Sequence, residues 1–319
     1  MSDTDLPLRR RCELLEDGVT DRAVGAKVRA GSLVRVRPGV YVDGSAWRGA
    51  RPEERVIARA RALSLVSHTP PVASHETAAA LHGLPVFRPD PARVHVIVPT
   101  ARPGAATGVV RHRGELDPSE VVEIDGVVCT SLERTIADMA RTASTEQSVV
   151  AGDAALRAIC GVGPGQYARD LAADFTERVR TIAHRSAHGV ARADRRLAFI
   201  DGRAQLPGES ISRIRLHQAG FRRLDLQVPV AGPPGRGYFF VDFWLRDAHA
   251  FGEFDGSIKY TDGRYTDDRS SFEVFDREKA REDWIRGSQQ APLVRWGWSH
   301  IRTAETLAAR LAAFGVVAP

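Results

Sequence analysis

The sequence predicts an α/β protein with several domains, and three observations support this prediction. The chain has 319 residues, which exceeds one ordinary domain and suits two or three. Segments with helical spacing of apolar residues alternate with short apolar segments that are typical of strands. The composition, with 43% hydrophobic and 27% charged residues, is that of a globular protein. The expected parts of the chain are residues 1–50, 51–160, 161–206 and 207–319.

Several classes of protein are excluded by the residue content. No segment approaches the roughly 20 consecutive apolar residues of a membrane helix, and residues 1–18 lack the apolar core of a signal peptide. We therefore expect a cytoplasmic protein that does not enter a membrane. Cys12, Cys129 and Cys160 are far apart and form no Cys-x-x-Cys pair, so neither a zinc site nor a disulfide framework is expected.

The charge balance is compatible with nucleic-acid binding. The formal net charge is +5 and the isoelectric point is about 9.4. The lysines are Lys27, Lys259 and Lys279, so 42 of the 45 basic residues are arginine. The planar guanidinium group matches the geometry of a phosphate, which favours polyanionic partners.

Residues 6–43 have the pattern of two helices followed by a β-hairpin. Helical spacing predicts a first helix over 8–15 and a second helix, with a polar cap and a terminating glycine, from about 20 to 30. The alternating segment 33–37 and the segment 40–42 are predicted strands, joined by a Pro-Gly turn. Together these elements predict an N-terminal winged helix-turn-helix domain.

Basic residues on the second helix and on the hairpin are the candidate DNA contacts. A helix fits the major groove, and cationic side chains neutralise phosphates. The candidates are Arg22, Lys27, Arg29, Arg35 and Arg37. The alternative is a helical protein-interaction domain with a solvated basic face.

Residues 51–160 are expected to form a middle α/β domain. The predicted helices cover 51–66, 75–82, 131–141 and 145–159, and the predicted strands cover 93–98, 109–113, 121–124 and 127–129. The spacing of His75, His82 and His95 builds no common metal site, so structural or surface roles are expected for them. A Gly/Pro-rich break then leads into an arginine-rich helical bridge, expected over 161–206.

Residues 207–319 have the order helix, three strands, helix, strand, helix, and two of the strands carry acids. Asp242 lies within an apolar, aromatic strand, where a charge is costly unless it is paired or binds a metal. Glu253 and Asp255 are two residues apart on the next strand, so they face the same side. Adjacent strands could bring Asp242 and Glu253 to one Mg²⁺ or Mn²⁺ ion, which activates water and neutralises phosphate charge. Glu209 at a helix start and Lys259 in a loop complete the candidate catalytic set.

This ordered set of residues resembles the PD-(D/E)XK nuclease superfamily, and most closely its branch of very-short-patch repair (Vsr-like) endonucleases. The match comprises Glu209, Asp242, the segment 253–256 (Glu-Phe-Asp-Gly) and Lys259, and it extends over 207–311. The resemblance implies a restriction-endonuclease-like mixed sheet flanked by helices, and phosphodiester cleavage with Mg²⁺ or Mn²⁺. Asp255 occupies the position of the family's lysine, two residues after the second acid. An active enzyme and an inactive nuclease fold therefore both remain open.

The first half of the chain resembles AbiEi-family antitoxins, which begin with a winged helix and continue into a second α/β domain. The segments that carry the likeness are GSLVRVRPGVYV (31–42), SHETAAALHGLP (74–85) and TSLERTIAD (130–138), within residues 6–160. The resemblance implies DNA binding, repression at the protein's own operator and opposition to a nucleotidyltransferase toxin.

Two hypotheses about function follow from the two resemblances. The chain is either a metal-dependent DNA-processing enzyme, located on DNA by its winged helix, or an antitoxin and transcriptional autorepressor of a type IV toxin–antitoxin operon. In the second case the C-terminal domain has lost catalysis and serves as an interaction module.

Overall fold

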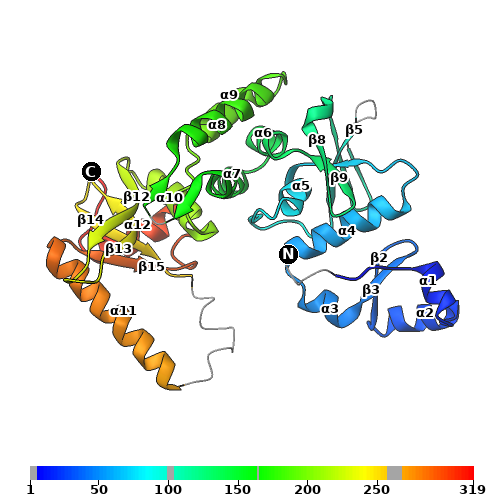
Figure 1. Ribbon diagram of the computed structural model, residues 1–319, viewed down its shortest axis with the longest axis horizontal. Helices are drawn as coiled ribbons and strands as arrows, with labels where there is room; N and C mark the ends of the chain where they lie inside the picture. The colour runs from blue at the N-terminus through cyan, green and yellow to red at the C-terminus, as the bar shows by residue number, and fades with distance from the viewer. Residues whose placement is uncertain (1–5, 99–103, 164, 257–267) are drawn as a thin grey trace. The chain divides into compact units, whose positions relative to one another are not determined.

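The protein forms two compact units, shown as a computed structural model in Figure 1. Unit 1 comprises Met1–Ala151 and Asp174–Phe199, and unit 2 comprises Gly152–Ala173 and Ile200–Pro319. The segment expected as a helical bridge, 161–206, is therefore shared between the two units. The structure describes residues 6–98, 104–163, 165–256 and 268–319.

Unit 1 begins with short helices and a small antiparallel sheet in the order β1-β3-β2. Its first elements are β1 (Arg9–Arg10), α1 (Arg11–Glu16), α2 (Asp21–Arg29), β2 (Leu33–Arg37), β3 (Val40–Asp43), α3 (Gly44–Gly49) and α4 (Pro52–Val66). The Thr20 hydroxyl accepts the N–H of Ala23 and so caps α2. Gly39 has φ +81° in the turn between β2 and β3, a conformation that favours glycine. The predicted order of helix, helix and hairpin is confirmed.

The first helix begins later than the sequence predicts, so the prediction of helix from residue 8 is wrong. Arg9 and Arg10 pair with Tyr41 and Val40 as the edge strand β1. This pairing gives β3 a second neighbouring strand. Backbone N–H and C=O groups of β3 that would otherwise face solvent at an open edge thereby gain partners in the protein. The helix then starts at Arg11.

Helices pack on both faces of this small sheet. On one face, Leu14 of α1 and Val24 of α2 form a buried cluster with Tyr41. On the other face, Ala58 and Ala62 of α4 are buried against the valines of the hairpin. The sheet therefore joins the two short helices to the next part of unit 1.

The middle part of unit 1 is a six-stranded mixed sheet with the strand order β6-β7-β5-β4-β9-β8. Its strands are β4 (Val72–Ala73), β5 (Val94–Val98), β6 (Gly104–Ala106), β7 (Val109–Arg113), β8 (Val121–Ile124) and β9 (Val127–Thr130). Its helices are α5 (His75–Leu81), α6 (Leu132–Thr142) and α7 (Thr145–Cys160), the last of which continues into unit 2. The strands β5, β7, β8 and β9 and all three helices lie where the sequence predicts them.

The segment after α7 contains a two-stranded hairpin and two helices. These are β10 (Gly161–Gly163), β11 (Gln166–Tyr167), α8 (Arg169–His184) and α9 (Val190–Leu197). Buried Arg196 of α9 donates to the carbonyl of Ala140 at 2.8 Å, and Arg141 donates to the carbonyl of His188 at 3.0 Å. These contacts attach α9 to α6 within unit 1. Among the described residues, no helix has both the length and the apolar character needed to cross a membrane.

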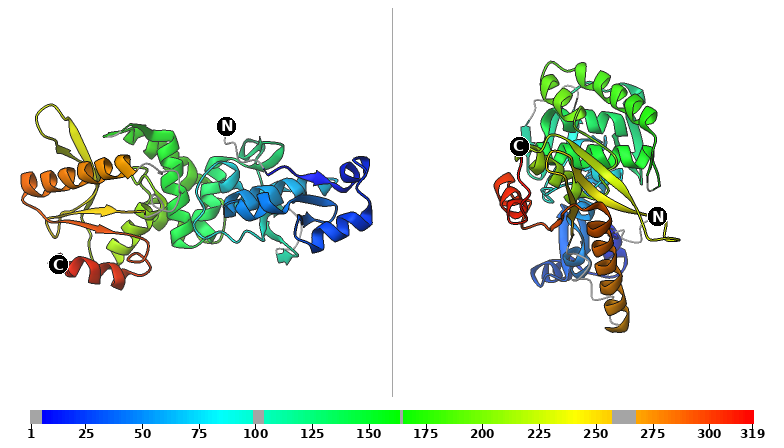
Figure 2. Two further views of the ribbon diagram at one scale, coloured as in Figure 1. Left: turned by 90° about the horizontal axis from the view of Figure 1, so that it is seen from below. Right: turned by 90° about the vertical axis from the view of Figure 1, so that its left-hand side faces the viewer.

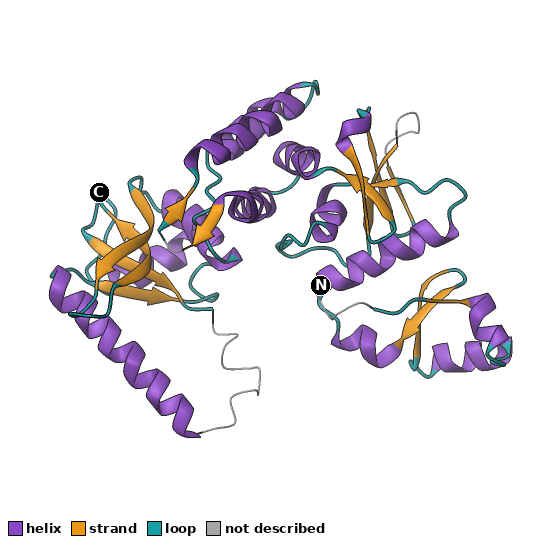
Figure 3. Cartoon of the chain, in the orientation of Figure 1, coloured by secondary structure: helices purple, strands orange, loops and turns teal. Residues whose placement is uncertain are grey.

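Unit 2 contains a four-stranded mixed sheet in the order β12-β13-β14-β15. Its elements are α10 (Pro207–Gln218), β12 (Leu224–Ala231), β13 (Tyr238–Leu245), β14 (Ala250–Phe254), α11 (Asp268–Gln289), β15 (Leu293–Trp296) and α12 (Ala304–Ala312). The first three strands are antiparallel, whereas β15 is parallel to β14. A parallel pair needs a crossover connection, which contains α11 (Figure 3). The order of elements predicted for this part of the chain is confirmed.

The sheet of unit 2 is covered by helices on both faces (Figure 2). On one face, Ile285 of α11 is buried with Val241 and Phe251. On the other face, the indole N–H of buried Trp296 donates to the hydroxyl of Ser212 in α10 at 2.8 Å. The strands therefore carry apolar side chains on both sides, as the predicted apolar segments indicate.

Side chains along β13 point alternately to the two faces of the sheet, and this alternation is interrupted at Asp242. Val241 and Trp244 both pack on the α11 face, although residues three apart in a regular strand face opposite sides. Gln227 lies opposite Asp242 in the register of β12 and β13 and has φ +50°, which is uncommon for a residue with a side chain. The irregular backbone thus coincides with the only acid inside β13.

Candidate functional site

The structure joins two of the predicted acids, Glu209 and Asp242, through one glutamine. The side-chain amide of Gln227 donates to Glu209 Oε2 and to Asp242 Oδ1, at 3.2 Å in each case. Glu209 Oε2 also accepts the backbone N–H of Gln205 at 2.8 Å, and Asp242 Oδ2 accepts the backbone N–H of Phe254 at 2.9 Å. The four residues Gln205, Glu209, Gln227 and Asp242 are called the acid site from here on.

Each acid is brought to this position by a different element. Glu209 lies in the first turn of α10, where Pro207 occupies the first helical position. Asp242 lies in the central strand β13, between β12 and β14. The helix start meets the sheet closely, because a Cβ at Gly208 would lie 2.0 Å from the ring of Phe254. A glycine at this position therefore allows α10 to place Glu209 next to β13.

The electrostatics of the acid site favour a bound proton or cation. Burial, together with the negative charge of the neighbouring Asp242, raises the pKa of Glu209 to about 8. Burial, with a smaller contribution from the charge of Glu253, raises the pKa of Asp242 to about 6. Neither acid forms an ion pair with another described residue. The two carboxyl groups thus bind protons more tightly than exposed acids do.

Glu253 lies on the neighbouring strand, as predicted, but its carboxylate is held by two arginines. Arg281 of α11 donates to Glu253 Oε1 at 2.7 Å, and Arg295 of β15 donates to Glu253 Oε2 at 3.0 Å. Glu253 is two residues after Phe251 and shares its face, on which α11 packs. The structure therefore places the Glu253 carboxylate in an ion-pair network with two arginines. The acid that Gln227 joins to Asp242 is Glu209 instead.

The remaining candidates of the catalytic set lie beyond β14. Asp255 is exposed, and its backbone N–H donates to the carbonyl of Trp296 at 2.7 Å. Lys259 lies outside the described residues. Within the part of the chain that the structure describes, no group of three or more His, Cys, Asp or Glu side chains is arranged to hold a metal ion.

Four of the five candidate DNA contacts are exposed on α2 and β2. Arg22, Lys27, Arg29 and Arg35 are exposed and form no ion pair with any described residue. Arg37 differs, because burial and the nearby Arg59 lower its pKa. A register shift lies between Arg35 and Arg37 in the pairing of β2 with β3, and Arg37 is partly buried whereas Arg35 is exposed.

Two of the three histidines considered in the sequence come together in unit 1 with a third that the sequence did not single out. The rings of His75 and His112 stack with centroids 3.6 Å apart, and His95 Nδ1 lies 3.0 Å from His112 Nε2. Burial lowers the pKa of His95 to about 4, and that of His75 is also well below its usual value. His82 lies apart and contacts the carbonyl of Thr130 at 2.8 Å. Neutral, packed imidazoles agree with the structural role expected.

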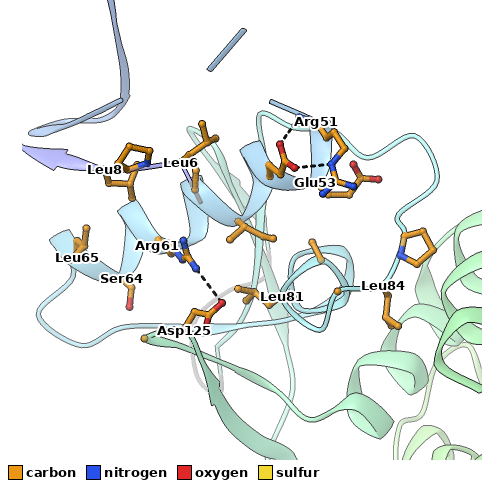
Figure 4. A pocket seen from close by; sticks show the side chains of 18 residues that line it. Leu6, Leu8, Arg51, Glu53, Arg61, Ser64, Leu65, Leu81, Leu84 and Asp125 are labelled. Carbon is orange, nitrogen blue, oxygen red and sulfur yellow. Dashed lines mark hydrogen bonds and ion pairs between the residues drawn. The ribbon is translucent and has the colours of Figure 1, made fainter. Parts of the chain in front are cut away.

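A large cavity in unit 1, of about 1130 Å³, is lined mainly by aliphatic side chains (Figure 4). Leu6, Leu8, Leu65 and Leu81 contribute to its walls. At one side, Arg61 forms an ion pair of 3.1 Å with exposed Asp125. None of the candidate residues from the sequence lines this cavity.

Comparison with known proteins gives relatives without a stated activity. No family model matches the chain. Two proteins described as uncharacterized, from Mycobacterium tuberculosis strains CDC 1551 / Oshkosh and H37Rv, are each 28% identical to it over 246 residues. The aligned region covers 77% of this chain and 81% of each relative. The similarity therefore spans most of both chains.

Proposed function

We propose that this chain is a DNA-binding protein whose unit 2 is a PD-(D/E)XK endonuclease-like domain that cleaves phosphodiester bonds with a divalent metal ion. The observation that carries the proposal is the acid site, in which buried Glu209 and partly buried Asp242 share the amide of Gln227. The topology also supports it: a helix precedes three antiparallel strands, and a crossover with a helix leads to a parallel fourth strand.

The acid site suits Mg²⁺ or Mn²⁺. These ions prefer oxygen ligands, and Mg²⁺ is usually held by one or two carboxylates while water and substrate phosphate supply the other ligands. Burial raises the pKa values of Glu209 and Asp242, and neither carboxylate has an ion-paired positive charge among the described residues. A bound divalent ion would supply that charge, neutralise the phosphate and activate a water molecule.

The residues of the chain have separate roles in this proposal. Asp242 and Glu209 are the primary metal ligands, and the N–H groups of Phe254 and Gln205 fix their orientation. The sequence predicts Asp242 and Glu253 as the metal ligands, with Glu209 in support. Glu253 reaches a metal only if Arg281 and Arg295 release it. We propose that Asp255 lies at the edge of the site and that Lys259 lies near the scissile phosphate.

The proposed DNA contacts lie in unit 1. Arg22, Lys27 and Arg29 on α2, and Arg35 on β2, are exposed cations without ion-pair partners among the described residues. A winged helix-turn-helix would use such a helix in the major groove and such a hairpin on the backbone. Arg37 contributes less to DNA binding in this proposal because it is half-buried beside Arg59.

The second candidate function is that of an AbiEi-type antitoxin and autorepressor. It is favoured by two specific observations: Glu253 is already neutralised by Arg281 and Arg295, and Asp255 occupies the position of the nuclease lysine. In that case the chain binds its own operator and opposes a cognate nucleotidyltransferase toxin, and unit 2 has no catalytic role.

A cleavage assay distinguishes the two functions. Plasmid and linear duplex DNA are incubated with the full chain and Mg²⁺ or Mn²⁺, with EDTA as the metal-free control. We expect cleavage by the wild type and by Asp283→Asn, which changes an exposed aspartate of α11, and none by Asp242→Asn. No cleavage by the wild type, or equal cleavage by Asp242→Asn, would contradict the nuclease proposal and leave the repressor proposal.

A further inference from the structure

A second cavity of unit 2 adjoins the acid site. It has a volume of about 350 Å³ and lies between the β10–β11 hairpin, the start of α8 and β12. Gln205 and Gln227 line this cavity and also donate to Glu209, so they form the wall between the two sites. The volume falls within the range of small-ligand pockets.

Three arginines and one aspartate line the cavity, so its charged lining is mostly positive. Among its charged residues, Arg203 is paired with Asp201 at 2.7 Å, and Asp225 accepts a hydrogen bond from Arg246 at 2.9 Å.

The other two charged lining residues, Arg157 and Arg169, are exposed and form no ion pair with described residues. Arg169 is also the first residue of the 16-residue helix α8, whose start adds partial positive charge. Two guanidinium groups in a concave site attract a phosphate group.

The remaining polar lining suits the uncharged part of a nucleotide. The Tyr167 hydroxyl accepts the backbone N–H of Gly202 at 3.2 Å, which fixes the side chain against the cavity. Burial raises the pKa of Tyr167 to about 12, so the hydroxyl stays neutral and keeps its proton for donation. A fixed aromatic side chain can stack with a base, and amides such as Gln166 can bond to its edge.

We propose that this cavity binds one nucleotide unit, with its phosphate held by Arg157 and Arg169 and its sugar or base against Tyr167. The inference rests on the proposed function, because the wall formed by Gln205 and Gln227 connects the cavity to the acid site. A strand with one nucleotide in the cavity has its next phosphodiester close to Glu209 and Asp242. Unit 2 would then recognise a strand by itself, independently of the candidate contacts on α2 and β2.

The test is titration calorimetry on the full chain in EDTA, so that no metal and no cleavage is involved. The probes are deoxyadenosine 5′-monophosphate, deoxyadenosine, inorganic phosphate and a 5′-phosphorylated pentadeoxyadenylate. We expect the monophosphate to bind more tightly than phosphate alone, and deoxyadenosine not to bind. Tighter binding of the pentanucleotide identifies a strand as the ligand, and equal binding identifies the free nucleotide.

The variants decide whether the two arginines carry the binding. Arg157→Ala/Arg169→Ala should weaken monophosphate binding by about tenfold or more, because two charge-assisted hydrogen-bond donors are lost. Arg236→Ala/Arg302→Ala removes two exposed arginines elsewhere in unit 2 and should bind as the wild type does. Equal affinity in both double variants, no binding by the wild type, or phosphate binding as tight as that of the monophosphate overturns the inference.

The outcome is independent of catalysis. The calorimetry is run in EDTA, so it measures nucleotide binding by the wild type whatever the cleavage assay shows. A chain that binds the nucleotide but cleaves no DNA would retain this inference and lose the nuclease proposal.

Discussion

Glu209 of α10 and Asp242 of β13 share one side-chain amide, that of Gln227, which donates a 3.2 Å hydrogen bond to each acid. The two hydrogens of an amide satisfy one oxygen of each carboxylate but supply no charge. The pair therefore needs a proton or a cation to compensate its negative charge.

The acid site should make the protein less stable as the pH rises. The pKa of Glu209 rises from 4.5 in a free side chain to about 8 in the folded protein. Ionising Glu209 in the folded protein lowers the free energy of unfolding. This loss of stability is absent below about pH 4.5, grows as the pH rises, and is complete above about pH 8. We expect the free energy of unfolding, measured with urea, to fall between pH 5 and pH 8. This decrease should be roughly 1–4 kcal/mol larger in the wild type than in Glu209→Gln.

A matched substitution gives the control for this pH dependence. Glu305→Gln changes an exposed glutamate of α12, and its pH dependence should follow that of the wild type. The same loss of stability between pH 5 and pH 8 in Glu209→Gln and the wild type would show that Glu209 is not the group responsible.

Replacing Glu253 should destabilise the folded protein. The Glu253→Gln variant leaves Arg281 and Arg295 without their shared carboxylate in a largely buried position. Breaking a buried ion pair on one side is destabilising, so we expect a loss of roughly 2–4 kcal/mol in the free energy of unfolding. Glu278→Gln, which removes a half-exposed partner of Arg295, should cost less than about 1 kcal/mol. Equal effects of the two substitutions would contradict the buried network.

Gly252 should be required for the packing of β14 on β15. A Cβ at this position would lie 2.2 Å from the ring of buried Trp296, and the ring is held by its bond to Ser212. Gly252→Ala should therefore lower the melting temperature, with a cost of roughly 1–3 kcal/mol. Gly287→Ala in α11 meets nothing within 4 Å and should raise stability by roughly 0.5–1 kcal/mol. Changes of the same sign in both variants would rule out the packing described for Gly252.

The basic surface of unit 1 should set the salt dependence of DNA binding. Each lost phosphate contact lowers the slope of log affinity against log salt by about 0.9. Arg22→Ala/Arg29→Ala should therefore flatten the slope by about two, measured by fluorescence anisotropy with a labelled duplex. Arg111→Ala/Arg113→Ala, which removes two arginines of β7, is the matched control. Identical slopes for the two double variants would favour a protein-interaction role for α2.

Much of unit 2 could be predicted from its sequence because each element has a clear pattern. The order of helices and strands from α10 to α12 follows from apolar spacing, and Asp242 stood out as a charge inside an apolar strand. Glu209 could be selected at a helix start by its resemblance to a nuclease pattern. The pattern thus identified the two acids that the structure brings together.

The rest of the acid site depends on contacts that no local pattern contains. Gln227 reaches both acids because its backbone has a φ of +50° and because β12 pairs with β13 in this register. Neither feature can be predicted from the residues next to Gln227 in the sequence. Glu253 was expected to share a cation with Asp242 because both lie on adjacent strands. The sequence does not show that Arg281, from a helix later in the chain, forms an ion pair with Glu253. His112 was missed for the same reason, because it meets His75 and His95 only through tertiary packing.

The most direct test of the central claim is a calorimetric titration of Mn²⁺ into the full chain at pH 7.5. The claim is that Glu209 and Asp242 form a divalent-cation site. We predict saturable binding to the wild type with release of protons from the acid pair, and loss of that binding in both Glu209→Gln and Asp242→Asn. Binding that is absent from the wild type, or unchanged in the two variants, would contradict the claim.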